Sequence, residues 1–322
     1  MMKRLMVLIL SITLIAGLLV GCGGKDIEKE SAGVDVSLES EGNQLWPRKI
    51  TDATGKEIEL KNKPERIAIL HSVYLEHFLA LNNPPIASAG SSRGDAMKAV
   101  NEWETLKPYK GNVDIIDLGS SREINLEAIL KAKPDVIVTF KGHGGLDEVY
   151  DQLVKIAPVI QLDFSSSWQE QTLACAEIVG EEEYARKFIE ETESTISNAK
   201  DKLSQYKNKT VALFRTDGKS FITRGDKDYY ETFGITRPEG YPDEFETLSL
   251  ETILSMNPDY IVFQDFIETA ETFVKSQENL SVWKSLEAVK NGNVFYFDDS
   301  LNTFGPLAMR LTAEKLVDMY LK

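Results

Sequence analysis

A seventeen-residue pattern that occurs twice constrains this chain more than any other feature. Residues 124–140 read INLEAILKAKPDVIVTF, and residues 248–264 read LSLETILSMNPDYIVFQ, with eight identical positions. In each copy, apolar residues three and four apart predict a short helix. A proline then ends the helix, and a β-branched run predicts a buried strand. Two copies about a domain length apart, with no further copies, indicate two similar lobes rather than a solenoid.

One glutamate is shared by both copies and lies on the polar side of each predicted helix. These residues are Glu127 and Glu251. Burial does not explain them. The simplest interpretation is a solvated first-turn residue favoured by the helix dipole. That interpretation accounts for a carboxylate at each position but does not require one in both copies.

The start of the chain is predicted to be a targeting segment. Lys3 and Arg4 precede an apolar run at residues 5–20, which is short for a membrane span and meets Gly21 and Cys22. Residues 19–22 (LVGC) resemble the bacterial lipoprotein box, in which the signal is cut before a cysteine that becomes lipidated. The expectation is therefore a signal peptide at residues 1–21, lipidation at Cys22, and a chain anchored to the cell membrane on its extracytoplasmic face.

Charge and cysteine usage narrow the functional class. The formal net charge is −15, and removing residues 1–21 takes away only Lys3 and Arg4 among the charged residues, so the mature chain is more acidic still. Acidity of this size argues against nucleic acid and suits a partner with a basic surface. Cys175 lies in an apolar helical stripe and is predicted to be a core thiol; once Cys22 is acylated it has no disulfide partner.

The remaining pattern predicts an α/β protein with largely parallel sheets. Residues 22–47 are polar and predict a flexible tether, and residues 49–60 alternate around a Thr-Gly turn and predict a hairpin. Strand and helix patterns alternate through an N-terminal lobe at 48–165 and a C-terminal lobe at 208–322. Between them, residues 166–207 are helical. Their longest part, residues 181–207, has no Pro or Gly and would span roughly 40 Å, enough to connect two lobes.

The order of these pieces resembles a known family, the substrate-binding lipoproteins of bacterial ABC importers for iron–siderophores, haem and cobalamin. The resemblance rests on TDATG at 51–55 with PERI at 64–67, on both Leu-Glu…Pro-Asp repeats, and on LEAVK at 286–290 followed by VFY at 294–296. It implies two α/β lobes joined by a single long helix, with the ligand in the cleft between them. It also implies a monomer whose permease presents arginines that grip one glutamate on each lobe. The matching residues are Glu127 and Glu251, and the contact would be charge-assisted.

Ligand-binding residues are expected in loops at strand ends, where ligands sit in open α/β sheets. A ferric siderophore wraps its own iron, so the protein needs no metal ligand or cofactor. It needs hydrogen-bond donors for anionic oxygens and aromatic faces. The segment at 232–238 (TFGITRP) resembles hydroxamate and citrate-type binders, which favours that class of ligand. Arg215 and Arg224 are the foremost candidates in a set that comprises Arg93, Lys141, His143, Arg215, Arg224, Tyr230 and Phe304.

Two alternatives remain. The three histidines, His71, His77 and His143, all lie in the first half of the chain, which disfavours a zinc or manganese binder and a haem binder. Haem or cobalamin stays open as an alternative ligand. Residues 90–94 (GSSRG) match the G-x-S-x-G pattern around Ser92, so a membrane-anchored serine hydrolase is the alternative from another class. Its triad requires a late histidine, and only His143 follows Ser92, so a non-enzymatic receptor is expected.

Overall fold

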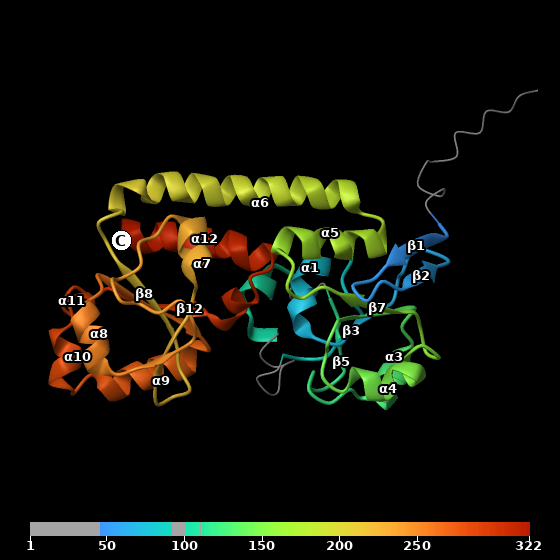
Figure 1. The fold of residues 1–322 in the computed structure, drawn as a ribbon, viewed down its shortest axis with the longest axis horizontal. Helices are drawn as coiled ribbons and strands as arrows, with labels where there is room; N and C mark the ends of the chain where they lie inside the picture. Colours follow the sequence, from blue (N-terminus) through green and yellow to red (C-terminus); the bar gives the residue numbers. More distant parts are fainter. Residues whose placement is uncertain (1–45, 92–100, 110, 112) are drawn as a thin grey trace, which may run out of the picture. The chain divides into compact units, whose positions relative to one another are not determined.

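The described residues build two five-stranded sheets and a two-stranded hairpin (Figure 1). The computed structural model describes residues 46–91, 101–109, 111 and 113–322. All of them belong to one unit, Gln44–Lys322. The predicted hairpin is confirmed: β1 (Arg48–Thr51) pairs antiparallel with β2 (Glu57–Leu60).

The first sheet forms the N-terminal lobe and is entirely parallel. Its strand order is β5 (Ile116–Asp117), β4 (Ala87–Ser88), β3 (Ile67–Ile69), β6 (Val136–Phe140) and β7 (Val159–Leu162). The described helices around it are η2 (Ser72–Tyr74), α1 (Leu75–Ala80), η3 (Glu104–Tyr109), α3 (Leu126–Ala132), α4 (Leu146–Leu153) and α5 (Trp168–Val179).

Strand β6 shows why this sheet is covered on both faces. Val136 and Val138 pack into one cluster with Phe78 of α1 and Cys175 of α5. Ile137, whose side chain points the other way, packs into a second cluster with residues of α3 and α4. A strand buried on both faces needs a continuous apolar run, which is what the sequence supplies. The predicted core position of Cys175 is confirmed, because this free thiol is fully buried.

The second sheet forms the C-terminal lobe and is mainly parallel. Strands β8 (Val211–Arg215), β11 (Tyr260–Asp265) and β12 (Val294–Asp298) run parallel. Strand β9 (Phe221–Thr223) pairs antiparallel with β8, and β10 (Thr247–Leu248) pairs antiparallel with β9 at the edge of the sheet. Its helices are α7 (Lys227–Phe233), α8 (Leu250–Met256), α9 (Ile267–Gln277), α10 (Ser281–Ser285), α11 (Glu287–Lys290), η5 (Asp299–Thr303) and α12 (Pro306–Leu321).

A single long helix, α6 (Glu182–Leu203), connects the two lobes. Figure 1 shows it running alongside α5 of the first lobe and α12 of the second, and it packs against both. Its 22 residues correspond to about 33 Å. This is shorter than predicted, because the chain tightens into a 3₁₀ turn, η4 (Ser204–Tyr206). The predicted two-lobe α/β fold with one long linking helix is confirmed.

The sequence repeat folds as the same unit in both lobes. The first copy gives α3 and β6, and the second gives α8 and β11. Each helix begins with a side-chain N-cap and ends at a left-handed residue, Lys133 in one copy and Asn257 in the other, and proline follows each. Ile129 and Ile253 are fully buried, but Leu130 is 60% exposed. Not every apolar position of the repeat therefore belongs to the core.

The aspartate of each Pro-Asp pair forms hydrogen bonds with the segment that leads into the neighbouring strand of its sheet. Asp135 accepts hydrogen bonds from the backbone N–H groups of Glu65 (2.8 Å) and Arg66 (3.0 Å), just ahead of β3. Asp259 accepts one from the backbone N–H of Thr210 (2.9 Å), just ahead of β8, and contacts Lys209 Nζ at 2.8 Å. The repeated aspartate therefore helps to fix the register of β6 beside β3 and of β11 beside β8.

Replacing either aspartate by asparagine is expected to lower the free energy of unfolding by about 1–2 kcal/mol, because the amide keeps one acceptor oxygen and turns an NH2 group toward a backbone donor. Urea titration of Asp135→Asn, Asp259→Asn and the double variant measures this. The effects should add within about 0.5 kcal/mol, since the sites lie in different lobes. Asp201→Asn, an exposed position on α6, is the control. No loss in either variant would contradict this role.

Candidate functional site

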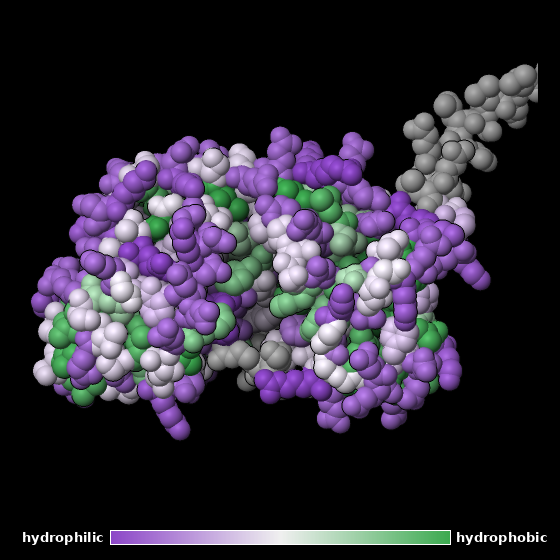
Figure 2. Space-filling model, in the orientation of Figure 1, coloured by the Kyte–Doolittle hydropathy of each residue, from purple (hydrophilic) through white to green (hydrophobic). Residues whose placement is uncertain are grey.

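A cavity of about 810 Å³ lies between the lobes and is lined by residues from both. Figure 2 shows the surface hollowed there, with hydrophobic and near-neutral side chains as well as hydrophilic ones around the hollow. The cavity lies where loops leave the carboxyl ends of strands in both sheets, the usual place for a ligand in α/β proteins.

The N-terminal lobe supplies an uncharged wall. Val73 and His77 come from η2 and α1, and Phe164, Trp168 and Gln171 come from the loop after β7 and from α5. The start of α5 is fixed by a capping box, in which the Ser167 hydroxyl accepts from the backbone N–H of Glu170 and the Glu170 carboxylate accepts from that of Ser167. This cap holds the neighbouring Trp168 ring at the cavity.

The C-terminal lobe supplies Arg224, Tyr229, Phe245 and Phe304. Arg224 follows β9 and is only 9% exposed. Its guanidinium carbon lies 4.3 Å from the ring centre of Phe304 and 5.0 Å from that of Phe245, both within the range of cation–π attraction. Burial lowers the pKa of Arg224, but arginine keeps its proton in proteins. The cavity therefore contains a fixed, largely desolvated cation.

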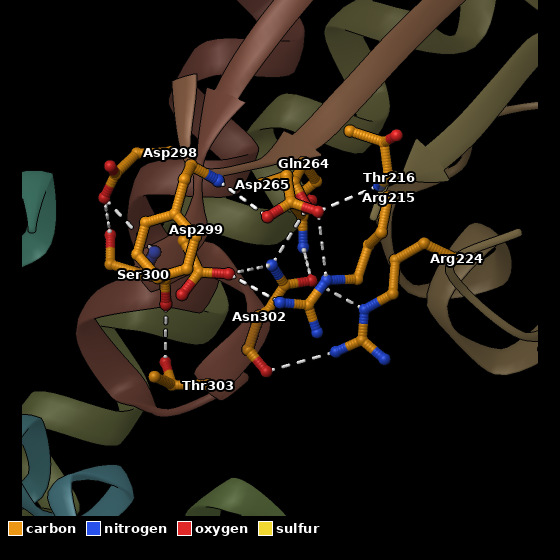
Figure 3. Close-up of polar contacts among 11 residues, drawn as sticks. Arg215, Thr216, Arg224, Gln264, Asp265, Asp298, Asp299, Ser300, Asn302 and Thr303 are labelled. Carbon is orange, nitrogen blue, oxygen red and sulfur yellow. Dashed lines mark hydrogen bonds and ion pairs between the residues drawn. The ribbon is translucent and has the colours of Figure 1, made fainter. Parts of the chain in front are cut away.

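Asn302 holds that cation in place (Figure 3). Its side-chain oxygen accepts from Arg224 Nε at 2.6 Å, and its backbone oxygen accepts from Nη2 at 3.1 Å. The Asn302 amide is held in turn, since its nitrogen donates to the Gln264 backbone oxygen (2.9 Å) and its oxygen accepts from Gln264 Nε2 (3.1 Å). Within the described residues, nothing accepts a hydrogen bond from Arg224 Nη1. That edge of the guanidinium is available to a ligand.

Arg215 lies in the same region but has a different role. Its Nη2 donates to Asp299 Oδ1 at 2.6 Å, and its Nε lies 3.6 Å from Asp265 Oδ2 (Figure 3). Arg215 does not line the cavity. Two carboxylates neutralise it, so its charge joins β8 to the segment after β12 and is not directed at a ligand.

Tyr230 lies in the core of the C-terminal lobe. It is 3% exposed, and its hydroxyl donates to the Val211 backbone oxygen at 3.0 Å. Its neighbour Tyr229 lines the cavity instead, with its hydroxyl 3.2 Å from Gln264 Oε1. The two rings differ because successive residues of α7 point in different directions.

The histidines are also arranged differently from the sequence-based expectation. His143 is 7% exposed, and its ring nitrogens lie 2.6 Å from Thr139 Oγ1 and from the Ser121 backbone oxygen, away from the cavity. His77, which is not among the predicted ligand-binding residues, lines the cavity while its Nδ1 contacts Thr172 Oγ1 at 2.9 Å. Burial lowers the pKa of His77 to about 3, so it is neutral at physiological pH. Lys141 is exposed and does not line the cavity.

Beside the cavity, Glu76 of the N-terminal lobe reaches into the C-terminal lobe. It is 1% exposed, and its Oε2 accepts from the backbone N–H groups of Leu307 (3.0 Å) and Ala308 (2.8 Å) in the first turn of α12. Its Oε1 accepts from the hydroxyl of Thr303, which lines the cavity. Gly305 permits this approach, because a Cβ there would overlap the carboxylate. Burial raises the pKa of Glu76 to about 7, although these donors oppose the shift.

The two glutamates of the sequence repeat, unlike Glu76, are not held by hydrogen bonds from other described residues. Glu127 and Glu251 occupy the first turns of α3 and α8 and are both exposed. Neither forms a hydrogen bond or ion pair with another described residue. Each lobe thus presents one free carboxylate on the same structural unit.

Some predicted features lie outside the described residues: the signal peptide, Cys22, Arg93 and Ser92. In the part of the chain that the structure covers, no three His, Cys, Asp or Glu side chains gather closely enough to hold a metal ion. No helix of that part is both long and apolar enough to cross a membrane.

Several residues at the cavity escaped the sequence-based prediction, namely His77, Phe164, Trp168, Tyr229 and Phe245. Phe164 and Phe245 carried one usable signal. Each is a large aromatic residue in a polar loop, and the structure leaves them 52% and 66% exposed. Exposed aromatic residues beside a cavity often mark a binding surface.

Comparison with known proteins matches the periplasmic binding protein family over residues 67–301. In Bacillus subtilis, the "Probable siderophore-binding lipoprotein YfiY" is 28% identical over 82% of this chain and 84% of its own, and the "Fe(3+)-citrate-binding protein YfmC" is 26% identical over 91% and 89%. The crystal structure of the B. subtilis iron-uptake system-binding protein FeuA superposes with a TM-score of 0.67 at 24% identity, covering 84% of this chain and all of FeuA. That of Staphylococcus aureus SirA complexed with staphyloferrin B gives 0.63 at 24% identity, over 85% and 98%. With a family match that spans most of the chain and the same fold in these structures, the chain belongs to the periplasmic binding protein family.

Proposed function

We propose that this chain is a non-enzymatic, extracytoplasmic receptor that captures a ferric siderophore and delivers it to an ABC importer. The observation that carries the proposal is the cation of Arg224, buried at the interlobe cavity between Phe245 and Phe304 and aimed by Asn302. The family match and the names of the relatives support it: YfiY is named a siderophore-binding lipoprotein and YfmC an Fe(3+)-citrate-binding protein.

The chemistry of the cavity suits a ligand that brings its own iron ligands. A ferric siderophore presents oxygens of partial negative charge over an organic shell. A guanidinium fork binds such oxygens, and aromatic rings pack against the shell. The Fe(III) ion is cargo, so the protein needs no cofactor and no metal ligand of its own. A cavity of about 810 Å³ falls within the usual size of a small-molecule site.

Titration followed by tryptophan fluorescence tests the proposal, because Trp168 lines the cavity and bound Fe(III) should quench its emission. The panel comprises ferric hydroxamate, citrate and catecholate complexes, haem and cobalamin. We expect saturable quenching by at least one ferric siderophore. Binding of haem or cobalamin alone would overturn the proposal. Esterase turnover that Ser92→Ala abolishes would favour the hydrolase alternative.

Delivery to the importer is proposed to use Glu127 and Glu251. Each lobe presents one exposed carboxylate without a described partner, and arginines of a permease would bind them in charge-assisted pairs. The double variant Glu127→Ala, Glu251→Ala is expected to reduce iron uptake by cells at least tenfold and to leave ligand affinity unchanged.

The matched control for docking is Glu148→Ala, Glu268→Ala. These glutamates are also exposed first-turn residues, of α4 in one lobe and α9 in the other. Normal uptake by the control and loss by the repeat variant would support docking at the repeat. Equal uptake by both would overturn it.

Anchoring is proposed through a lipid on Cys22, with the chain acting as a monomer. The basis is the lipobox at residues 19–22 and the polar stretch that follows it. Cys22→Ser is expected to prevent incorporation of labelled fatty acid and to release the protein from the membrane fraction. Membrane retention of this variant would contradict the anchor, and light scattering of the mature protein tests the monomer.

A further inference from the structure

The charges around the interlobe cavity are unbalanced. Among the described residues that line it, the charged ones are the buried Arg224 and four exposed carboxylates, Asp226, Asp228, Asp243 and Glu244. Arg237 forms an ion pair with Asp243 and offsets one of them. The described lining is therefore net negative, although it has a cation at its centre.

Two other described cations that the sequence suggested for the site, Arg215 and Lys141, do not change this balance. Arg215 is held between Asp265 and Asp299 and is absent from the lining, and Lys141 is exposed elsewhere in its lobe. The described wall of the N-terminal lobe contributes no charged side chain, because His77 is neutral at physiological pH. Among the described lining residues, a single guanidinium thus faces a ligand, and exposed carboxylates surround it.

The walls nearest the ligand are apolar. Phe164 of one lobe and Phe245 of the other both line the cavity and remain largely exposed. Phe304 covers the guanidinium of Arg224 at 4.3 Å. A ligand in this cavity would meet aromatic surface on both lobes, with one donor fork for a small group of oxygens.

We propose, on the basis of the proposed function, that this cavity selects ferric siderophores by net charge: it accepts neutral tris(hydroxamate) complexes and rejects polyanionic citrate and catecholate complexes. Three hydroxamates, each a monoanion, neutralise Fe(III), whereas three dianionic catecholates leave a trianion. A trianion gains one attraction from Arg224 and meets repulsion from the four exposed carboxylates, which is strongest at low ionic strength. A neutral complex can use the aromatic walls and the guanidinium without that repulsion.

Affinity for three complexes tests the selection: ferrichrome as the neutral tris(hydroxamate), ferri-bacillibactin as the tris(catecholate), and ferric citrate. We expect ferrichrome to bind the wild-type protein at least about tenfold more tightly than either anionic complex at low ionic strength. Added salt should narrow that gap by screening the repulsion. Equal affinities, or tighter binding of an anionic complex, would overturn the selection and leave the proposed function standing. Binding of no ferric complex would overturn both.

Reversing the charge of two lining carboxylates tests the same selection in a second way. Asp228→Lys, Glu244→Lys replaces two lining carboxylates that have no described ion-pair partner, and it should improve binding of ferri-bacillibactin about tenfold or more relative to ferrichrome. Glu190→Lys, Asp201→Lys makes the same change in net charge on the exposed face of α6 and should leave the ratio of affinities unchanged. An equal shift in both double variants would mean that total charge, not the cavity, sets the preference, and would overturn the proposal.

Discussion

Glu76→Ala is expected to lower the free energy of unfolding by about 3–5 kcal/mol and to weaken ligand binding as well. The substitution leaves the backbone N–H groups of Leu307 and Ala308 without their acceptor in a largely buried place, and it removes one of the two acceptors of the Thr303 hydroxyl. Each such donor costs about 1–3 kcal/mol. Binding should weaken because Thr303 and the following Phe304 line the cavity. Urea titration and ligand titration measure the two effects.

The ionisation of Glu76 adds a dependence of stability on pH. Its pKa is raised from 4.5 to about 7, chiefly by burial, so the folded state holds this proton more tightly than the unfolded chain. The stability that the bound proton contributes is complete below about pH 4.5, and it is lost as the pH rises through about 7. A shift of this size corresponds to about 3 kcal/mol. His77 beside it has a pKa of about 3 and stays neutral throughout that range.

Glu76→Gln separates ionisation from packing. The amide has the same shape, its oxygen can accept from the first turn of α12, and its NH2 group can face the Thr303 hydroxyl oxygen. This variant should stay folded, and the fall in its stability between pH 5 and 7 should be smaller than that of the wild type by about 2 kcal/mol. Thr192→Val, a buried substitution in α6 away from this contact, is a control that should keep the wild-type slope. An unchanged slope in Glu76→Gln would show that another group carries the pH dependence.

The fold was predictable because its signals are local. The helix–proline–strand repeat specifies α3 with β6 and α8 with β11 through spacing and capping alone. The same repeat also pointed to Glu127 and Glu251, which the structure places on exposed first turns. The length of α6 was overestimated, since no proline or glycine marks the change to a 3₁₀ turn at Ser204–Tyr206.

The residues of the cavity were less predictable, because contacts between segments far apart in the sequence decide which side chains face it. Arg215 and Arg224 look equivalent in the sequence, yet Asp265 and Asp299, which are far away along the chain, form ion pairs with Arg215. Tyr229 and Tyr230 are adjacent aromatics on a short helix, and the sequence does not fix which of them faces the core. His143 sits in a glycine-rich loop typical of binding sites, but Thr139 and the Ser121 backbone hold it inside the lobe.

Arg224→Ala is expected to weaken binding of the preferred ferric siderophore by about 100-fold, or about 3 kcal/mol. The variant removes a desolvated charged donor and the cation–π contacts with Phe245 and Phe304. Arg224→Lys should recover only part of the affinity, because an ammonium keeps the charge but lacks the planar fork that Asn302 aims. Tryptophan quenching measures both dissociation constants.

Stability has to be measured beside affinity, because Arg224 also joins β9 to the segment after β12 through Asn302. The change in affinity is attributed to the ligand contact only if the variant still unfolds in one cooperative step and remains folded under the binding conditions. Arg186→Ala removes an exposed arginine of α6 and should leave binding unchanged. Folded Arg224→Ala that binds as tightly as the wild type would place the ligand elsewhere, since this guanidinium is the buried cation among the described residues that line the cavity.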